Sequence, residues 1–153
     1  MEKILISACL FGEKVRYDGG DTLIDDPIMA QWKKEDRFIV LCPEVAGGLP
    51  VPRKPCERDL ETGQVISQDG EDFTEAFHQG ASIALNLAKK HNIRYALLKE
   101  RSPSCGVNLI YDGTFTSNKI KGLGVVAKLL KENGINIYSE FDLDQLKSDL
   151  HEK

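Results

Sequence analysis

The sequence has no long hydrophobic run. Nothing in its 153 residues approaches the roughly 20 consecutive apolar residues that a membrane span needs. The apolar stretch in MEKILISACLFG, near the N-terminus, is about as long as one strand and lacks the h-region and cleavage site of a signal peptide. We therefore expect a cytoplasmic protein with no membrane partner.

The chain also lacks an excess of positive charge. It carries 20 Lys and Arg against 24 Asp and Glu, a formal net charge of -4. A protein that binds duplex DNA through bulk charge needs a basic surface. We therefore expect a small-molecule ligand and no nucleic-acid partner, and the sequence leaves the oligomeric state open.

Cysteine pairs of the CxxC type are absent. The four cysteines are widely spaced, and thiols in a cytosolic chain stay reduced. The three histidines, His78, His91 and His151, fall on predicted helices, where we expect them on the surface rather than at strand ends. A structural zinc site wants four ligands. Any metal site must therefore be assembled by the fold, mainly from cysteines.

Short apolar runs alternate with helical patterns, and no linker, repeat or low-complexity tract interrupts them. We expect strands at residues 3–8, 37–41, 93–98 and 135–138, and helices at residues 26–35, 71–91, 122–133 and 142–151. We expect an irregular segment over residues 42–70 and a hairpin over 107–115 that turns at Asp112 and Gly113. The alternation predicts one α/β domain over residues 1–153, Rossmann-like, with a mainly parallel sheet and helices on both faces.

Three cysteines fall just after predicted strands. Cys9 and Cys42 directly follow the first two strands, and Cys105 follows the third after a short turn. Ligands bind at the carboxyl ends of parallel strands, and neighbouring strands lie about 4.8 Å apart, so these thiols should converge. Three thiolates without a matching histidine favour an iron–sulfur cluster with one open iron. Cys56, in a proline-rich loop, is either a separate thiol or a fourth ligand.

Polar residues accompany these cysteines. Glu44, two residues after Cys42, is either a solvated loop carboxylate or a general acid or base. Ser102 and Ser104 either satisfy local backbone groups or direct hydroxyls at a ligand. Arg53 either binds a polar substrate or forms an ion pair.

Glycines at 122–124 begin a predicted helix, and the free N–H groups at such a helix start are able to bind an anion. A lone GxG is weak evidence, however, and the chain contains neither a Walker motif nor a complete dinucleotide fingerprint. The pattern alone does not predict a nucleotide site.

Several longer motifs carry a family resemblance. The segments SACLFG, VRYDGG, CPEVAGGLPVPR, KERSPSCG and DGTF resemble the 2-thiouracil desulfidase (TudS-like) family, long catalogued as a domain of unknown function. The likeness runs from about Ile4 to Ile137. It implies an α/β fold that binds a 4Fe-4S cluster through three cysteines, here Cys9, Cys42 and Cys105.

The resemblance also implies a reaction. The fourth iron, without a protein ligand, takes the sulfur of a thiolated uracil, and hydrolysis yields uracil and sulfide without net redox change. Glu44 and Ser102 match the assisting glutamate and serine, and Arg53 and Ser104 are candidate substrate-binding residues. Cys56 departs from the family pattern.

Two other functions remain open. In the first, Cys56 completes a four-cysteine site in a non-catalytic metal-binding or redox-sensing protein. In the second, Cys105 is the nucleophile of a metal-free thiol enzyme, although the sequence places no histidine base nearby. Of the three hypotheses, we expect the desulfidase function.

Overall fold

The computed structural model describes residues 1–151, without the side chain of His151. The surface position expected for that side chain, and the last two residues of the domain predicted over 1–153, lie outside the described residues. Within residues 1–151, none of the helices combines the length and the apolar character that crossing a bilayer requires.

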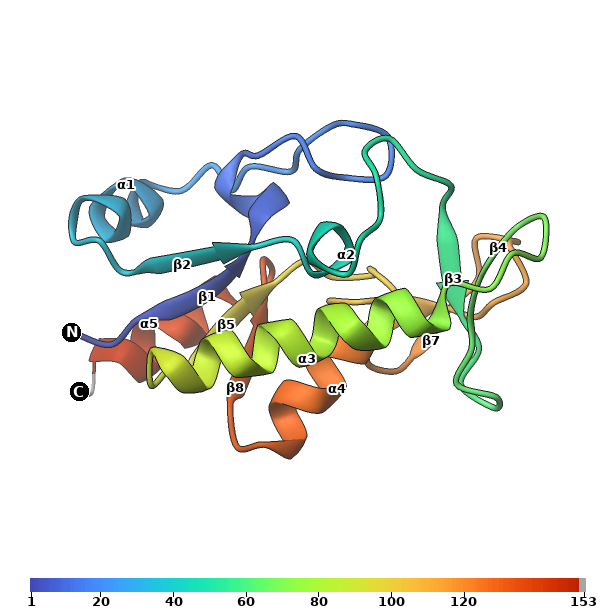
Figure 1. Cartoon of the computed structure of the whole chain (residues 1–153). Coiled ribbons are helices and arrows are strands. Elements are labelled where there is room, and N and C mark those ends of the chain that lie inside the picture. The colour runs from blue at the N-terminus through green and yellow to red at the C-terminus, as the bar shows by residue number, and fades with distance from the viewer. Residues whose placement is uncertain (152–153) are drawn as a thin grey trace.

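The centre of the molecule is a parallel sheet (Figure 1). Its strands are β1 (Ile4–Ser7), β2 (Phe38–Leu41), β5 (Tyr95–Leu98) and β8 (Asn136–Ser139), in the spatial order β2-β1-β5-β8. All three pairings are parallel. All four strands were predicted, and β1 lies between β2 and β5, so the chain segments that follow these three strands lie side by side.

Helices cover both faces of this sheet. One face packs against α3 (Thr74–Lys90) and α4 (Val125–Glu132), and the other packs against α1 (Pro27–Lys34) and α5 (Leu143–His151). Successive strand side chains point to opposite faces, so in β1 Leu5 joins the first core while Ile4 and Ile6 join the second. The predicted α/β architecture is confirmed.

The helix boundaries follow local chemistry. The Asp26 side chain accepts a hydrogen bond from the Ile28 N–H at 2.9 Å, and Pro27 occupies the first turn of α1. Gly134, just beyond α4, has a φ of 81°, as expected for a residue that ends a helix in the left-handed region. Phe77 of α3 is fully buried in the core, as its helical spacing predicted.

The expectation of an irregular segment over residues 42–70 was wrong. This stretch contains a one-turn helix, α2 (Pro43–Ala46), and a small antiparallel hairpin of β3 (Cys56–Arg58) and β4 (Val65–Ser67). Pro43 begins α2 because its fixed φ suits a first helical position. Elements of three or four residues are too short to produce a readable hydrophobic period.

The second hairpin was placed too early. Its strands are β6 (Leu109–Tyr111) and β7 (Lys119–Lys121), joined by a loop over residues 112–118. The Asp112 carboxylate accepts hydrogen bonds from the Thr114 N–H and hydroxyl, at 2.9 and 2.6 Å. This side-chain turn replaces the expected tight Asp-Gly reversal and lengthens the connection.

The short helix α2 is held against α3 by two glycines. A Cβ built on Gly80 would lie 2.1 Å from the Pro43 carbonyl oxygen, and one on Gly47 would lie 2.1 Å from the Ala76 carbonyl oxygen. Only residues without a side chain allow the two backbones to approach this closely. This contact fixes the start of α2, where Cys42 and Glu44 lie.

Candidate active site at the edge of the sheet

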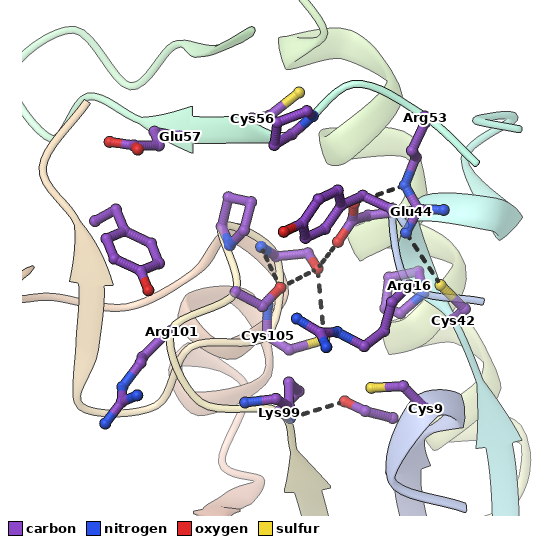
Figure 2. A pocket seen from close by; sticks show the side chains of 18 of the residues that line it. Cys9, Arg16, Cys42, Glu44, Arg53, Cys56, Glu57, Lys99, Arg101 and Cys105 are labelled. Carbon is purple, nitrogen blue, oxygen red and sulfur yellow. Dashed lines mark hydrogen bonds and ion pairs between the residues drawn. The ribbon is translucent and has the colours of Figure 1, made fainter. Parts of the chain in front are cut away.

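A cavity of about 430 Å³ opens at the carboxyl ends of β1, β2 and β5 (Figure 2). The structure brings all the predicted site residues to its walls, namely Cys9, Cys42, Cys105, Glu44, Arg53, Ser102 and Ser104. Cys56 also lines it. The predicted residues therefore share one cavity at the edge where parallel sheets generally bind ligands.

The three strand-end cysteines lie on three different elements. Cys9 belongs to a 3-10 turn, η1 (Ala8–Phe11), directly after β1, and Cys42 lies at the start of α2 after β2. Cys105 lies in the loop after β5 and is 3% exposed, while Cys9 is 8% exposed. Burial is the main cause that raises the pKa of all three thiols, Cys105 to about 12. Neighbouring thiolates add to the increase for Cys9 and Cys105, and the Glu44 carboxylate adds to it for Cys42.

Polar groups surround each of these sulfurs. The Thr22 hydroxyl lowers the pKa of Cys9, and the N–H groups of Val45 and Glu44 lower the pKa of Cys42. The buried Thr22 hydroxyl has no hydrogen-bond partner of standard geometry among residues 1–151. Donors directed at sulfur stabilise the thiolate that a metal requires.

Cys105 has hydroxyl neighbours of its own. Ser104 Oγ lies 3.5 Å from Cys105 Sγ, and the hydroxyls of Ser104 and Ser7 both lower the pKa of this thiol. Ser7 Oγ also accepts the Lys99 N–H at 3.0 Å, which fixes it at the end of β1. The third sulfur is thus provided with donors in the same way as the other two.

The donor set fits a cluster better than a single ion. Within the described residues, no three His, Cys, Asp or Glu side chains are grouped so that they could hold one metal ion. In an iron–sulfur cluster each cysteine binds its own iron, so the thiols surround the group from separated positions. Three thiols around one cavity, each with hydrogen-bond donors, meet that requirement.

Cys56 stands apart from the other three thiols. It lies in β3, its Sγ is 3.6 Å from the Lys54 carbonyl oxygen, and Figure 2 shows its sulfur turned away from the other three. Burial, together with the negative charge of Glu44, raises the pKa of Cys56 to about 12. Its surroundings are those of a separate thiol.

Glu44 and Arg53 form a largely buried ion pair. Arg53 Nε lies 3.0 Å from Glu44 Oε1, with the two side chains only 7% and 16% exposed. The same guanidinium donates to the Pro50 carbonyl oxygen at 3.2 Å and reaches to 4.0 Å from Cys42 Sγ. Arg53 thus connects the carboxylate to one of the sulfurs.

The two predicted serines differ in what they contact. Ser104, 1% exposed, donates its hydroxyl to Glu44 Oε2 at 3.0 Å. Ser102 Oγ accepts the N–H groups of Ser104 and Cys105, each at 3.1 Å, and lies 2.9 Å from Ser104 Oγ. The hydroxyl next to the carboxylate is therefore that of Ser104, and the Ser102 hydroxyl reaches the carboxylate only through that of Ser104.

Sequence reasoning missed Glu100, which shapes the Cys105 loop. This carboxylate is 3% exposed and accepts the N–H groups of Val107, Asn108 and Leu109 at 2.9 to 3.0 Å. Burial alone would raise the pKa of Glu100, but these hydrogen bonds lower it overall. The sequence shows only a glutamate shortly before a Ser-Pro-Ser turn. This pattern does not indicate from which N–H groups the carboxylate accepts hydrogen bonds.

The possible anion site at the start of α4 is not available. The N–H groups of Val125 and Val126 donate to the carbonyl oxygens of Pro103 and Ser104, at 3.0 and 2.8 Å. A Cβ on Gly124 would lie 2.4 Å from the Ser104 carbonyl oxygen. Gly124 therefore allows the Cys105 loop to pack against the start of α4, and the carbonyl oxygens of that loop occupy the N–H groups that an anion would need.

The fold and the site together define an α/β protein with a three-thiol centre beside a buried carboxylate. Comparison with known proteins then places the chain, because a model of the 2-thiouracil desulfurase family matches residues 4–142. The chain belongs to this family, as the sequence motifs predicted.

Two relatives extend this result. "Uncharacterized protein YbbK" of Bacillus subtilis (strain 168) is 38% identical, over 94% of this chain and 99% of its own length. A solved structure described as 4Fe-4S-dependent thiouracil desulfidase TudS (DUF523Vcz) is 44% identical. The two structures cover each other completely, with a TM-score of 0.97.

Proposed function

We propose that this protein is an iron–sulfur-dependent desulfidase that removes sulfur from a thiolated pyrimidine such as 2-thiouracil, giving the oxo base and sulfide. The observation that carries the proposal is the convergence of Cys9, Cys42 and Cys105 on one cavity that also holds Glu44. The 44% identical structure with this fold is described as a 4Fe-4S-dependent thiouracil desulfidase, which supports the same chemistry here.

Cys9, Cys42 and Cys105 are the residues that would hold the 4Fe-4S cluster. When bound, such a cluster supplies an iron without a protein ligand, a Lewis acid that takes up soft sulfur and polarises a C–S bond. The hydroxyls of Thr22 and Ser7 lower the pKa of Cys9 and Cys105, respectively, which favours their thiolates. We place Cys56 outside the ligand set.

Glu44 is the proposed general base. Hydrolysis replaces the C=S sulfur by the oxygen of water, and the two protons of that water leave with the sulfide. Arg53 engages Oε1 of Glu44, so Oε2 is the oxygen that takes a proton from the attacking water. General acid–base assistance of this kind contributes about 10²–10⁴-fold to a rate.

The two serines extend the path from Glu44. The Ser104 hydroxyl bonds to Oε2 and also to Ser102 Oγ, so a proton taken by the carboxylate can pass along hydroxyl groups toward the departing sulfur. We assign the direct role to Ser104 and the outer position to Ser102. The Arg53 guanidinium already donates to Glu44 and to the Pro50 carbonyl oxygen. We therefore assign Arg53 to holding Glu44 and not to binding substrate.

The metal-free thiol enzyme is not favoured. Cys105 is buried, and its raised pKa keeps the thiol protonated at neutral pH, whereas the thiolate is the nucleophile. No histidine from the described part of the chain lines the cavity, so a base of that type is missing. Because thiolate ligands persist in a reducing compartment, we also propose that the enzyme works in the cytoplasm.

The test begins with protein purified and reconstituted without oxygen. We expect about four irons and four acid-labile sulfides per chain, as for one 4Fe-4S cluster. Incubation with 2-thiouracil should then release uracil and sulfide in equal amounts, and the Glu44→Gln protein with the same iron content is the control. If fully reconstituted protein releases no sulfide from any thiolated base, the proposed function is wrong.

A further inference from the structure

Two hairpins form the wall of the cavity that faces the thiols. The β3–β4 hairpin contributes Glu57, and the β6–β7 hairpin contributes Tyr111, Phe115 and Ser117. Figure 2 shows Glu57 across the cavity from Cys9 and Cys42, with its carboxylate pointing away from the sulfurs. Glu57 therefore faces the neighbouring hairpin and does not face the position of the chemistry.

One oxygen of Glu57 binds two N–H groups of the other hairpin. Oε1 accepts the Gly113 N–H at 2.9 Å and the Phe115 N–H at 3.2 Å. Hydrogen bonds to an ionised carboxylate are about twice as strong as neutral ones. These bonds link two hairpins whose sequence positions differ by more than 50 residues.

The loop that Glu57 holds is conformationally unfavourable. Phe115 and Ser117 have φ values of 59° and 61°, in the left-handed region that residues with a Cβ rarely adopt. Such residues persist only where the surroundings fix them. Without the carboxylate, the backbone at 113–115 would lose the two bonds that oppose its relaxation.

We propose that Glu57 is a positioning residue for substrate binding, which acts by fixing Phe115 as the wall against which the pyrimidine ring packs. This inference rests on the proposed function. A flat ring in the cavity has its sulfur directed at the thiols, so its faces and far edge must meet the opposite wall. Aromatic side chains there bind a base by stacking, which is insensitive to the base's exact substitution.

The experiment compares Glu57→Gln, Phe115→Leu and the double variant with the wild-type protein, all reconstituted to equal iron content. We expect each single variant to raise KM for 2-thiouracil about tenfold, the size of one weakened stacking contact, with kcat changed less than about twofold. Because the two side chains act on the same contact, the double variant should have nearly the same KM as the worse single variant. Glu61→Gln, exposed on the same hairpin, is the matched control and should leave KM unchanged.

Amide hydrogen exchange gives a readout that does not depend on activity. In Glu57→Gln, the Gly113 and Phe115 amides should exchange at least about tenfold faster than in wild type, whereas Glu61→Gln should leave both unchanged. Addition of uracil to the wild-type protein should slow both amides, and addition to Phe115→Leu should slow them less.

The outcomes separate this inference from the proposed function. If the wild-type protein turns over 2-thiouracil but both single variants keep the wild-type KM, the positioning role is wrong and the desulfidase stands. If the wild-type protein shows no turnover but uracil still protects the two amides in a Glu57-dependent way, the proposed function fails and the positioning role stands. Equal loss of kcat in both variants, with KM unchanged, would also overturn the positioning role.

Discussion

The Ser104 hydroxyl lies 3.0 Å from Oε2 of Glu44, although 60 positions separate the two residues in the chain. Glu44 follows β2 and Ser104 follows β5, and these strands flank β1 on its two sides. The contact therefore spans the end of β1, the strand that Cys9 follows. A carboxylate, a hydroxyl and the three thiols become one site only because the sheet has this strand order.

Glu44 and Ser104 should be separable by substitution. We expect Glu44→Gln to lower kcat by about 10²–10⁴-fold, because a general base is lost, and Ser104→Ala to lower it less. Ser102→Ala should have the smallest effect of the three on kcat, since its hydroxyl does not touch the carboxylate. Initial rates of sulfide release, at matched iron content, measure all three. A larger loss of kcat in Ser102→Ala than in Ser104→Ala would reverse our assignment of the two serines.

The ligand set should follow the arrangement of the thiols. Replacement of Cys9, Cys42 or Cys105 by serine should each prevent recovery of about four irons per chain on anaerobic reconstitution. Cys56→Ser should retain the full iron content, because its sulfur points away from the others. Iron analysis and visible absorbance decide between these results. Loss of the cluster in Cys56→Ser would instead support the four-cysteine, non-catalytic protein.

The close approach of α2 to α3 should be sensitive to a single methyl group. Gly80→Ala gains about 1 kcal/mol in helix propensity. Its Cβ, however, would lie 2.1 Å from the Pro43 carbonyl oxygen, a backbone atom that cannot move without α2. We expect the clash to dominate, with a net loss of about 1–3 kcal/mol in the free energy of unfolding and reduced desulfidase activity. Chemical denaturation measures the first quantity.

Gln79→Ala, at an exposed position next to Gly80 in α3, is the matched control for that experiment. It should change the free energy of unfolding by no more than about 0.5 kcal/mol. A Gly80→Ala protein as stable and as active as this control would show that α2 can shift freely, and that its contact with α3 does not position Glu44.

Glu100 should make stability depend on acid. Its pKa is lowered in the folded state, so the ionised carboxylate stabilises the fold fully above its unfolded pKa of about 4.3. That contribution is lost as the pH falls through the lower, folded value. Glu100→Gln should therefore cost about 1.5–3 kcal/mol at neutral pH, and the difference from wild type should shrink below about pH 4.

Thermal unfolding of both proteins at neutral and acid pH tests this expectation. Asn108→Ala is a useful companion, because it removes the side-chain donor to Glu100 Oε2 but leaves the three backbone N–H bonds. A stability difference between wild type and Glu100→Gln that stays constant from neutral pH down to about pH 3 would contradict the role given to the ionised carboxylate.

The sequence predicted the sheet strands and the helices that cover the sheet. The four strands of the sheet were predicted from short apolar runs that alternate with helical patterns, and Asp26, Pro27 and Gly134 mark helix boundaries by local backbone chemistry. The strands of the two hairpins could not be predicted, because each has only three residues and pairs with a single neighbouring strand outside the main sheet. The 112–118 loop was misplaced because the Asp112 side chain, and not a glycine turn, sets the reversal.

The sequence by itself determined which residues could carry the chemistry. Its cysteines follow three strands, its motifs belong to one family, and a glutamate and two serines accompany the thiols. Only the tertiary structure decided how they act together, because strand order and backbone approach are collective properties of the whole sheet. It paired Ser104 with Glu44, tied Arg53 to that carboxylate, and turned Cys56 away. It also gave Glu100 and Glu57 their partners, since hydrogen bonds between distant segments have no signal along the chain.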